Sequence, residues 1–198
     1  MIDTLLAAFS GPGAAFMYAI TALLAFAIAV TIERSVTFWI RWRIDENAAI
    51  GRAEAGEITE LSALVEGHPV SKLVQAGANA RDGETAWDTM TAAAALLERT
   101  IRLRIGALAT VGNLATIIGL LGTVYGLILA FSGLEAASAV ERSARLSAGI
   151  ATAMATTAWG LLVGIPALAA HALLEGKANR LLSFCEALAG YVAASRRS

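Results

Sequence analysis

The chain has 198 residues, enough for one domain, and its formal net charge of −1 argues against an electrostatic nucleic-acid partner. Charged residues make up 16% and apolar residues 57% of the sequence, and the mean hydropathy is +0.65. A soluble domain carries about 25% charged residues, so this composition excludes an ordinary soluble protein. The single cysteine, Cys185, excludes a disulfide-stabilised secreted scaffold.

The deficit of charge is concentrated in three runs without Asp, Glu, Lys or Arg, at residues 4–32, 105–134 and 146–174. A helix of about 20 residues crosses the hydrocarbon core of a bilayer, so each run is long enough to span it. The sequence therefore predicts an all-α membrane protein with three transmembrane helices. It gives no support for an enzymatic activity.

The first predicted element lies within residues 1–43 and comprises an N-terminal periplasmic end and the first transmembrane helix. No Lys or Arg precedes Arg34, and the apolar stretch is longer than that of a cleavable signal peptide, so we expect a retained span. Trp39 and Trp42 alternate with basic residues where this helix would leave the lipid. They are predicted interface anchors, with membrane lipid as their partner.

Residues 44–104 are predicted to form a cytoplasmic helical region, whose middle is divided by glycines and a proline into short helices. From Asp88 the chain consists largely of strong helix formers. We therefore expect one continuous helix from Asp88 to about Ala130, which carries the second transmembrane span (105–134) far beyond the membrane.

The second span contains three polar side chains, Asn113, Thr116 and Thr123, at spacings of three and seven residues. This spacing places them on one helical face. The third span contains a second polar group, Thr152, Thr156 and Thr157. A single Thr in a span usually donates to a carbonyl of its own helix. A row of polar side chains on the second span together with a cluster on the third favours a different interpretation, in which these side chains line a water-filled interior.

A short periplasmic link (135–145) is predicted to precede the third span (146–174), which continues into a cytoplasmic helical tail (175–198). Of the 15 basic residues, only Arg142 and Arg145 fall in that link, and the other 13 lie within residues 33–104 and in the tail. Basic residues near span ends stay in the cytoplasm, so the N-terminus is predicted outside and the C-terminus inside.

Small residues in the second and third spans allow two helix backbones to approach closely. They pack helices either within one subunit or between subunits, and the pattern alone does not distinguish these alternatives. Pro166 removes one helix hydrogen bond from the third span and is expected to kink it. The predicted packing glycines are Gly119, Gly122, Gly126, Gly160 and Gly164.

No carboxylate or Lys lies deep in any span, and His171 lies close to the predicted cytoplasmic end of the third span. The hydroxyl groups that remain do not titrate near neutral pH. If the protein conducts protons, a partner must supply the titrating group. The sequence also indicates no metal site.

Two long motifs resemble the second and third spans of the TolQ/ExbB proton-channel proteins, which are distant relatives of the flagellar stator subunit MotA. They are GLLGTVYGLILAF (Gly119 to Phe131), preceded by LLERTIRLRIGALATVGNLATII, and GIATAMATTAWGLLVGIPAL (Gly149 to Leu168). The resemblance covers about residues 96–176. Glu33 and Arg34 at the end of the first span are also similar to the family.

The resemblance implies a homopentamer in the bacterial inner membrane, whose pore encloses two copies of a single-span ExbD/TolR-like partner. An Asp on the partner helix would carry protons driven by the membrane potential, and no cofactor is expected. The client would be of the TonB type in biopolymer transport, the TolA type in envelope maintenance, or a gliding-motility apparatus. Channels lined by hydroxyl groups conduct either H⁺ or Na⁺. The resemblance to a proton-channel family implies that the ion conducted here is H⁺.

The resemblance assigns the pore threonines to Thr123 and Thr157, which would hydrate and position the partner's Asp. Two residues depart from the family pattern: Thr152 stands where some members have a Glu, and Thr116 where many have a Pro. Proton handling would then depend more fully on the partner. The alternative function is a helical membrane scaffold that conducts nothing and whose polar rows serve packing alone.

Overall fold

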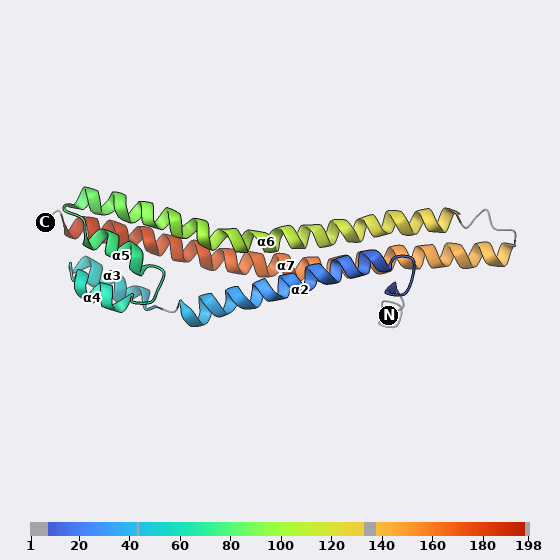
Figure 1. Cartoon of the computed structure of the whole chain (residues 1–198), viewed down its shortest axis with the longest axis horizontal. Coiled ribbons are helices and arrows are strands. Elements are labelled where there is room, and N and C mark those ends of the chain that lie inside the picture. Colours follow the sequence, from blue (N-terminus) through green and yellow to red (C-terminus); the bar gives the residue numbers. More distant parts are fainter. Residues whose placement is uncertain (1–7, 43, 133–137, 197–198) are drawn as a thin grey trace. The chain divides into compact units, whose positions relative to one another are not determined.

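All regular elements in the described part of the chain are helices (Figure 1). The computed structural model describes residues 8–42, 44–132 and 138–196. In chain order the elements are α2 (Ala14–Val36), the π-helical turn η1 (Thr37–Arg41), α3 (Glu46–Glu54), α4 (Ile58–Leu64), α5 (Ser71–Ala78), α6 (Gly83–Ser132) and α7 (Ala139–Ser195). The predicted all-α fold is confirmed.

Three helices are long and apolar enough to cross a membrane: α2 together with η1, α6 and α7. Helix α6 has 50 residues and α7 has 57, so at 1.5 Å per residue each is more than twice as long as a bilayer core. The expected continuous helix from Asp88 to about Ala130 is confirmed, and it begins five residues earlier than expected. Of the predicted link at 135–145, residues 135–137 lie outside the described residues, and from Ala139 onward the chain already belongs to α7.

The chain divides into two compact units. The first, here called the apolar unit, consists of Met1–Thr31 and Gly106–His171. The second, called the charged unit, consists of Ile32–Ile105 and Ala172–Ser198.

Backbone contact between α6 and α7 organises the apolar unit. A Cβ atom added at Gly126 would lie 2.6 Å from the Ala153 backbone nitrogen, and one added at Gly164 would lie 2.9 Å from the Gly112 carbonyl oxygen. Gly119, Gly122 and Gly160 are in equally close contact with the facing helix. These five glycines therefore lie against the facing helix of the same chain, and a role between subunits stays a prediction.

Helix α2 is joined to this pair through an indole group that sequence reasoning did not single out. The Nε1 of Trp159 donates to the hydroxyl oxygen of Thr21 at 3.1 Å, and that hydroxyl donates to the Met17 carbonyl at 2.8 Å. Beside this chain of bonds, Ile20 packs into a small apolar core with α6 and α7. A buried indole N–H needs an acceptor, and Thr21 supplies it.

The charged unit contains α3, α4 and α5 together with the ends of the long helices. The carboxylate of Asp45 accepts from the Asn47 and Ala48 backbone N–H groups and begins α3. In the same way, Asp82 accepts from the Thr85 N–H at 2.8 Å at the start of α6. Arg196, which follows α7, donates to the carbonyls of Ala78, the last residue of α5, and of Ala80 just beyond it. The two caps define where α3 and α6 begin, and the Arg196 bonds connect the ends of α5 and α7.

His68 lies in the turn before α5 and is only 6% exposed. Its Nδ1 accepts from the Val70 backbone N–H at 3.3 Å, which requires the unprotonated form at that nitrogen. Burial lowers the pKa of His68, and the Trp42 backbone offsets part of that effect.

Substituting Gly160→Ala is expected to destabilise the apolar unit. The new Cβ would lie 2.7 Å from the Ala115 carbonyl oxygen and 3.0 Å from the Gly119 Cα, and backbone atoms cannot move aside cheaply. Overpacking of this kind costs about 1–3 kcal/mol. The matched control is Gly106→Ala, which meets nothing within 4 Å and replaces a helical glycine by a better helix former. Thermal unfolding in detergent should show a lower midpoint for the first variant only; equal midpoints would contradict the contact.

The buried His68 predicts a loss of stability in mild acid. Because its pKa is lowered in the folded state, the unfolded chain binds the proton more readily once the pH falls below about 6.5. Stability should therefore be highest above that pH and decrease as the pH falls below it. Thermal midpoints of the native chain and of His68→Gln, measured above and below that pH, should converge as the pH falls. Parallel curves would show that His68 does not contribute.

Candidate functional site

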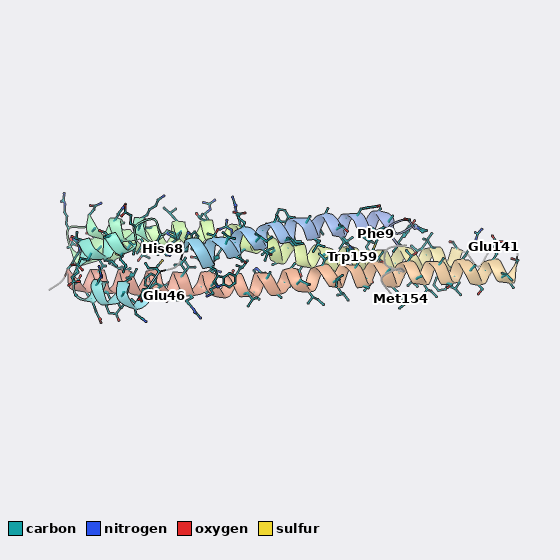
Figure 2. All side chains as sticks on the ribbon, turned by 90° about the horizontal axis from the view of Figure 1, so that it is seen from below. Phe9, Glu46, His68, Glu141, Met154 and Trp159 are labelled. Atoms are coloured by element: carbon teal, nitrogen blue, oxygen red, sulfur yellow. The ribbon has the colours of Figure 1, made fainter. Side chains whose placement is uncertain are left out.

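A groove of about 500 Å³ lies between the α6 and α7 segments of the apolar unit. Two hydroxyl-bearing residues, Thr123 and Thr157, contribute to its wall. The other lining residues are apolar and include Met154, which is 69% exposed on the outer face of α7 (Figure 2). The remaining lining residues are Leu127, Ile150, Ala153, Ala158 and Leu161.

The two groove hydroxyls make different hydrogen bonds. Thr157 donates from its Oγ1 to the Gly119 carbonyl of the facing helix at 3.4 Å. Thr123 donates to the Leu120 carbonyl of its own helix. A hydroxyl that donates its proton retains lone pairs that can accept. Each hydroxyl can therefore accept from a water or a protonated carboxyl group in the groove, and can donate to a carboxylate once its own bond is broken.

The other predicted pore residues lie away from this groove. The hydroxyls of Thr116, Thr152 and Thr156 donate to carbonyls of their own helices at 2.9 to 3.1 Å. Thr156 is fully buried, and Thr152 lies beside Gly13. Asn113 is exposed on α6 and does not line the groove. The structure thus brings together Thr123 and Thr157 and separates them from the other four, and a pore role for any of the six stays a prediction.

The separation has a simple geometric cause. Consecutive residues of an α-helix point about 100° apart, so the neighbours Thr156 and Thr157 point in different directions. Thr156 packs toward Gly122 in the helix interface, whereas Thr157 lies at its margin beside the groove. The spacing of polar residues in the sequence could place those of the second span on one face of α6. It could not indicate which face of α7 packs against α6.

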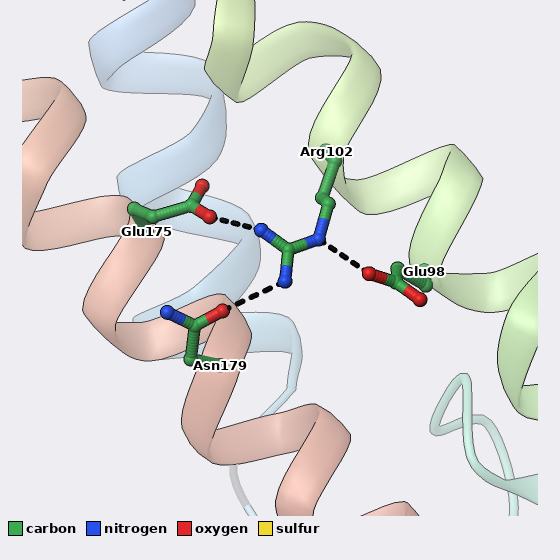
Figure 3. Close-up of polar contacts among 4 residues, drawn as sticks. All are labelled: Glu98, Arg102, Glu175 and Asn179. Carbon is green, nitrogen blue, oxygen red and sulfur yellow. Dashed lines mark hydrogen bonds and ion pairs between the residues drawn. The ribbon is translucent and has the colours of Figure 1, made fainter.

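An ion-pair network joins α6 and α7 within the charged unit (Figure 3). The guanidinium of Arg102 donates to Glu98 at 2.6 Å, to Glu175, and to the Asn179 side-chain oxygen at 2.9 Å. All three acceptors surround one planar donor group, which holds the two helices in a defined register. Arg102 and Glu175 are 73 residues apart, so no local pattern could have indicated their contact.

A second set of charges lies at the end of the first span. Glu33 accepts from Arg104 and lies 3.6 Å from the guanidinium of the buried Arg34. The pair of residues by which the sequence resembled a known family thus connects α2 to α6 inside the charged unit. Nothing in the sequence placed Arg104 in this contact.

The predicted interface anchors lie in the charged unit. Trp39 is 47% exposed, and the Lys177 ammonium lies 5.7 Å from the centre of its ring. Trp42 contacts Phe38 and His68 edge-on. Pro166 lies inside α7, which continues as a helix on both sides of it. Among the described residues no group of three or more His, Cys, Asp or Glu side chains could hold a metal ion.

Comparison with known proteins gives one family. A model of the MotA/TolQ/ExbB proton channel family matches residues 65–187, and that description concerns a channel rather than an enzyme. An ExbB-like biopolymer transport protein of Helicobacter pylori is 40% identical over 87 residues, which are 44% of this chain and 57% of that protein. The biopolymer transport protein exbB1 of Vibrio cholerae is 40% identical over 85 residues, 43% of this chain and 37% of its own. The Tol-Pal system protein TolQ of Pseudomonas aeruginosa is 34% identical over 85 residues, 43% of this chain and 36% of its own. The aligned part of the chain thus spans between about one third and three fifths of the length of these relatives.

The network around Arg102 predicts that Arg102→Gln loosens the charged unit. The substitution would leave Glu175 and Asn179 without their shared donor. Arg99→Gln is the matched control, because it removes the same charge from the exposed face of the same helix. The thermal midpoint in detergent should fall by several degrees for Arg102→Gln and stay close to native for Arg99→Gln. Equal shifts of the thermal midpoint in both variants would mean that the hydrogen bonds of Arg102 add nothing to stability beyond its positive charge.

Proposed function

Because the chain belongs to the MotA/TolQ/ExbB proton channel family, we propose that it is the channel and stator subunit of a motor that converts the proton motive force into mechanical work. The observation that carries the proposal is the groove in which Thr123 and Thr157 meet on an otherwise apolar surface. Two hydroxyls on such a surface can form hydrogen bonds with a charged group inside the membrane. They would lower the free energy that this group needs to leave water.

The proton carrier must come from another chain. Residues 105–134 and 146–174 contain no Asp, Glu, Lys or Arg, so the groove itself has no group that changes charge near neutral pH. We propose that a single-span ExbD/TolR-like partner places an Asp beside the groove. Thr123 and Thr157 would accept from the protonated Asp and donate to its carboxylate, which lowers the barrier between the two states.

The assembly we propose is a homopentamer around two copies of the partner. Each subunit would then turn its groove toward a central pore, and a partner helix would meet several grooves in succession. A proton that crosses 100 mV releases about 2.3 kcal/mol, so several protons per cycle can move a helix against load. Unequal numbers of grooves and partner helices would prevent all contacts from being satisfied together and would favour rotation.

The proposed location is the bacterial inner membrane, with the N-terminus periplasmic and the C-terminus cytoplasmic. The distribution of basic residues supports this orientation. The client would be an envelope protein of the TonB or TolA type, or a gliding apparatus, since relatives include ExbB and TolQ proteins. We propose H⁺ as the ion and no cofactor; Na⁺ is the alternative that an ion-substitution experiment distinguishes.

One observation favours the second candidate, a scaffold that conducts nothing. Thr116, Thr152 and Thr156 all donate to their own helix carbonyls, as expected for hydroxyls that serve packing. In that case Thr123 and Thr157 would matter for assembly rather than for ion flow. The two functions therefore differ in what happens when both hydroxyls are replaced.

The test is the double variant Thr123→Val/Thr157→Val, which keeps the shape of both side chains and removes both hydroxyls. Proton flux is measured with a pH-sensitive dye in vesicles that contain the chain and its co-purified partner, under an imposed membrane potential. We expect at least a tenfold loss of flux with an unchanged oligomeric mass. Thr110→Val is the matched control, since Thr110 is exposed on α6, donates to its own helix and lies outside the groove.

Native flux in the double variant would refute the assignment of the groove to the pore. Loss of the oligomer together with flux would favour the scaffold. Repeating the experiment with Na⁺ in place of the proton gradient identifies the ion.

A further inference from the structure

A second groove, of about 570 Å³, lies in the charged unit between the η1 turn, the start of α3 and the α7 helix. It combines aromatic rings with positive charge, through Trp39 and Trp42 on one side and Lys177 and Arg180 on the other. None of these four residues belongs to the ion-pair networks described above. The other lining residues are Phe38, Ile44, Glu46, His68 and Leu181.

The two cations of this groove are available to an outside ligand. Among the described residues, neither Lys177 nor Arg180 makes an ion pair, and Lys177 is held only by the face of the Trp39 ring. Arg180 is exposed and carries five N–H donors that suit a phosphate group. Glu46 is the one carboxylate in the wall, and the buried His68 is neutral near pH 7, so the groove keeps a net positive charge.

Its position along the chain is that of a membrane surface. The uncharged runs end at residues 32 and 174, so Trp39 follows the first by seven residues and Lys177 follows the second by three. At 1.5 Å per residue these side chains are about 10 Å and 5 Å beyond the apolar part of their helices, which is the depth of lipid headgroups. Tryptophan and basic residues are the side chains expected at that depth.

We propose that this groove binds the headgroup phosphate of an anionic phospholipid from the cytoplasmic leaflet. The leaflet rests on the orientation proposed above. Arg180 and Lys177 hold the phosphate oxygens, the two indole rings contact the glycerol region, and Phe38 and Leu181 contact the first part of an acyl chain. A bound lipid would fasten the η1 turn to α7, beside the contact of Lys177 with the Trp39 ring.

Charge complementarity selects this occupant. A second copy of the chain would have to bring carboxylates to Lys177 and Arg180, whereas an anionic lipid surface is present wherever the protein is inserted. Each basic residue near a membrane surface favours anionic lipid by about 1 kcal/mol, a factor of about five. A zwitterionic lipid carries the same phosphate with a compensating ammonium and gains much less.

The experiment uses tryptophan quenching by brominated lipids, because Trp39 and Trp42 line the groove. The full chain is reconstituted in vesicles of phosphatidylethanolamine and phosphatidylglycerol in which only one of the two carries bromine. We expect brominated phosphatidylglycerol to quench at least fivefold more per mole fraction than brominated phosphatidylethanolamine. Lys177→Gln/Arg180→Gln should bring that ratio close to one, and Arg180→Gln alone should bring it part of the way.

Two further variants localise the effect. Lys72→Gln/Arg81→Gln removes the same charge from exposed positions of the charged unit outside the groove, and it should keep the native ratio. Trp39→Phe keeps both cations but removes a reporter, so the excess quenching should decrease. Proton flux is measured in parallel, and the lipid preference is expected whether or not the channel conducts.

Four results would overturn the proposal. Equal quenching by the two lipids in the native chain would show that the groove does not select charge, and an unchanged ratio in Lys177→Gln/Arg180→Gln would place the selection elsewhere. Loss of the excess on adding millimolar inorganic phosphate would assign the site to a free anion. If Lys177→Gln/Arg180→Gln changes the oligomeric mass but not the quenching ratio, the groove would be assigned to contact with a second copy of the chain.

Discussion

The close approach of α6 and α7 is the constraint on which the rest of the structure depends. Glycines at the contact let one backbone lie against the other, with no room for a Cβ at Gly126 or Gly160. Because the backbones are so close, Thr157 can donate to the Gly119 carbonyl across the interface. The groove with Thr123 and Thr157 exists only at the margin of this contact, so the packing and the candidate site have the same cause.

The chemistry of the two spans is defined by the residue types they lack. Hydroxyls orient water and carboxyl groups but keep their protons at neutral pH. A channel built from such a surface needs a titrating group from another chain, and a dependence of this kind allows ion flow to be coupled to the movement of that chain. The same reasoning explains why a hydroxyl rather than a carboxylate at Thr152 is compatible with the proposed function.

The sequence predicted most of the fold because its signals are long. Uncharged runs gave the three spans, and an uninterrupted series of helix formers gave α6 past Asp88. It could not predict which side of α7 faces α6, so it grouped Thr156 with Thr157 although they point to different surfaces. The contacts of Arg102 with Glu175 and of Trp159 with Thr21 were also beyond reach, because they join residues far apart in the chain.

The central claim is that the channel is incomplete without a partner that carries the titrating group. Native mass spectrometry of the complex extracted from its own membrane, with every co-purifying chain identified, tests this most directly. The account predicts five copies of this chain around two copies of a single-span protein with an Asp in its membrane helix. A homo-oligomer that conducts protons without any such partner would contradict it.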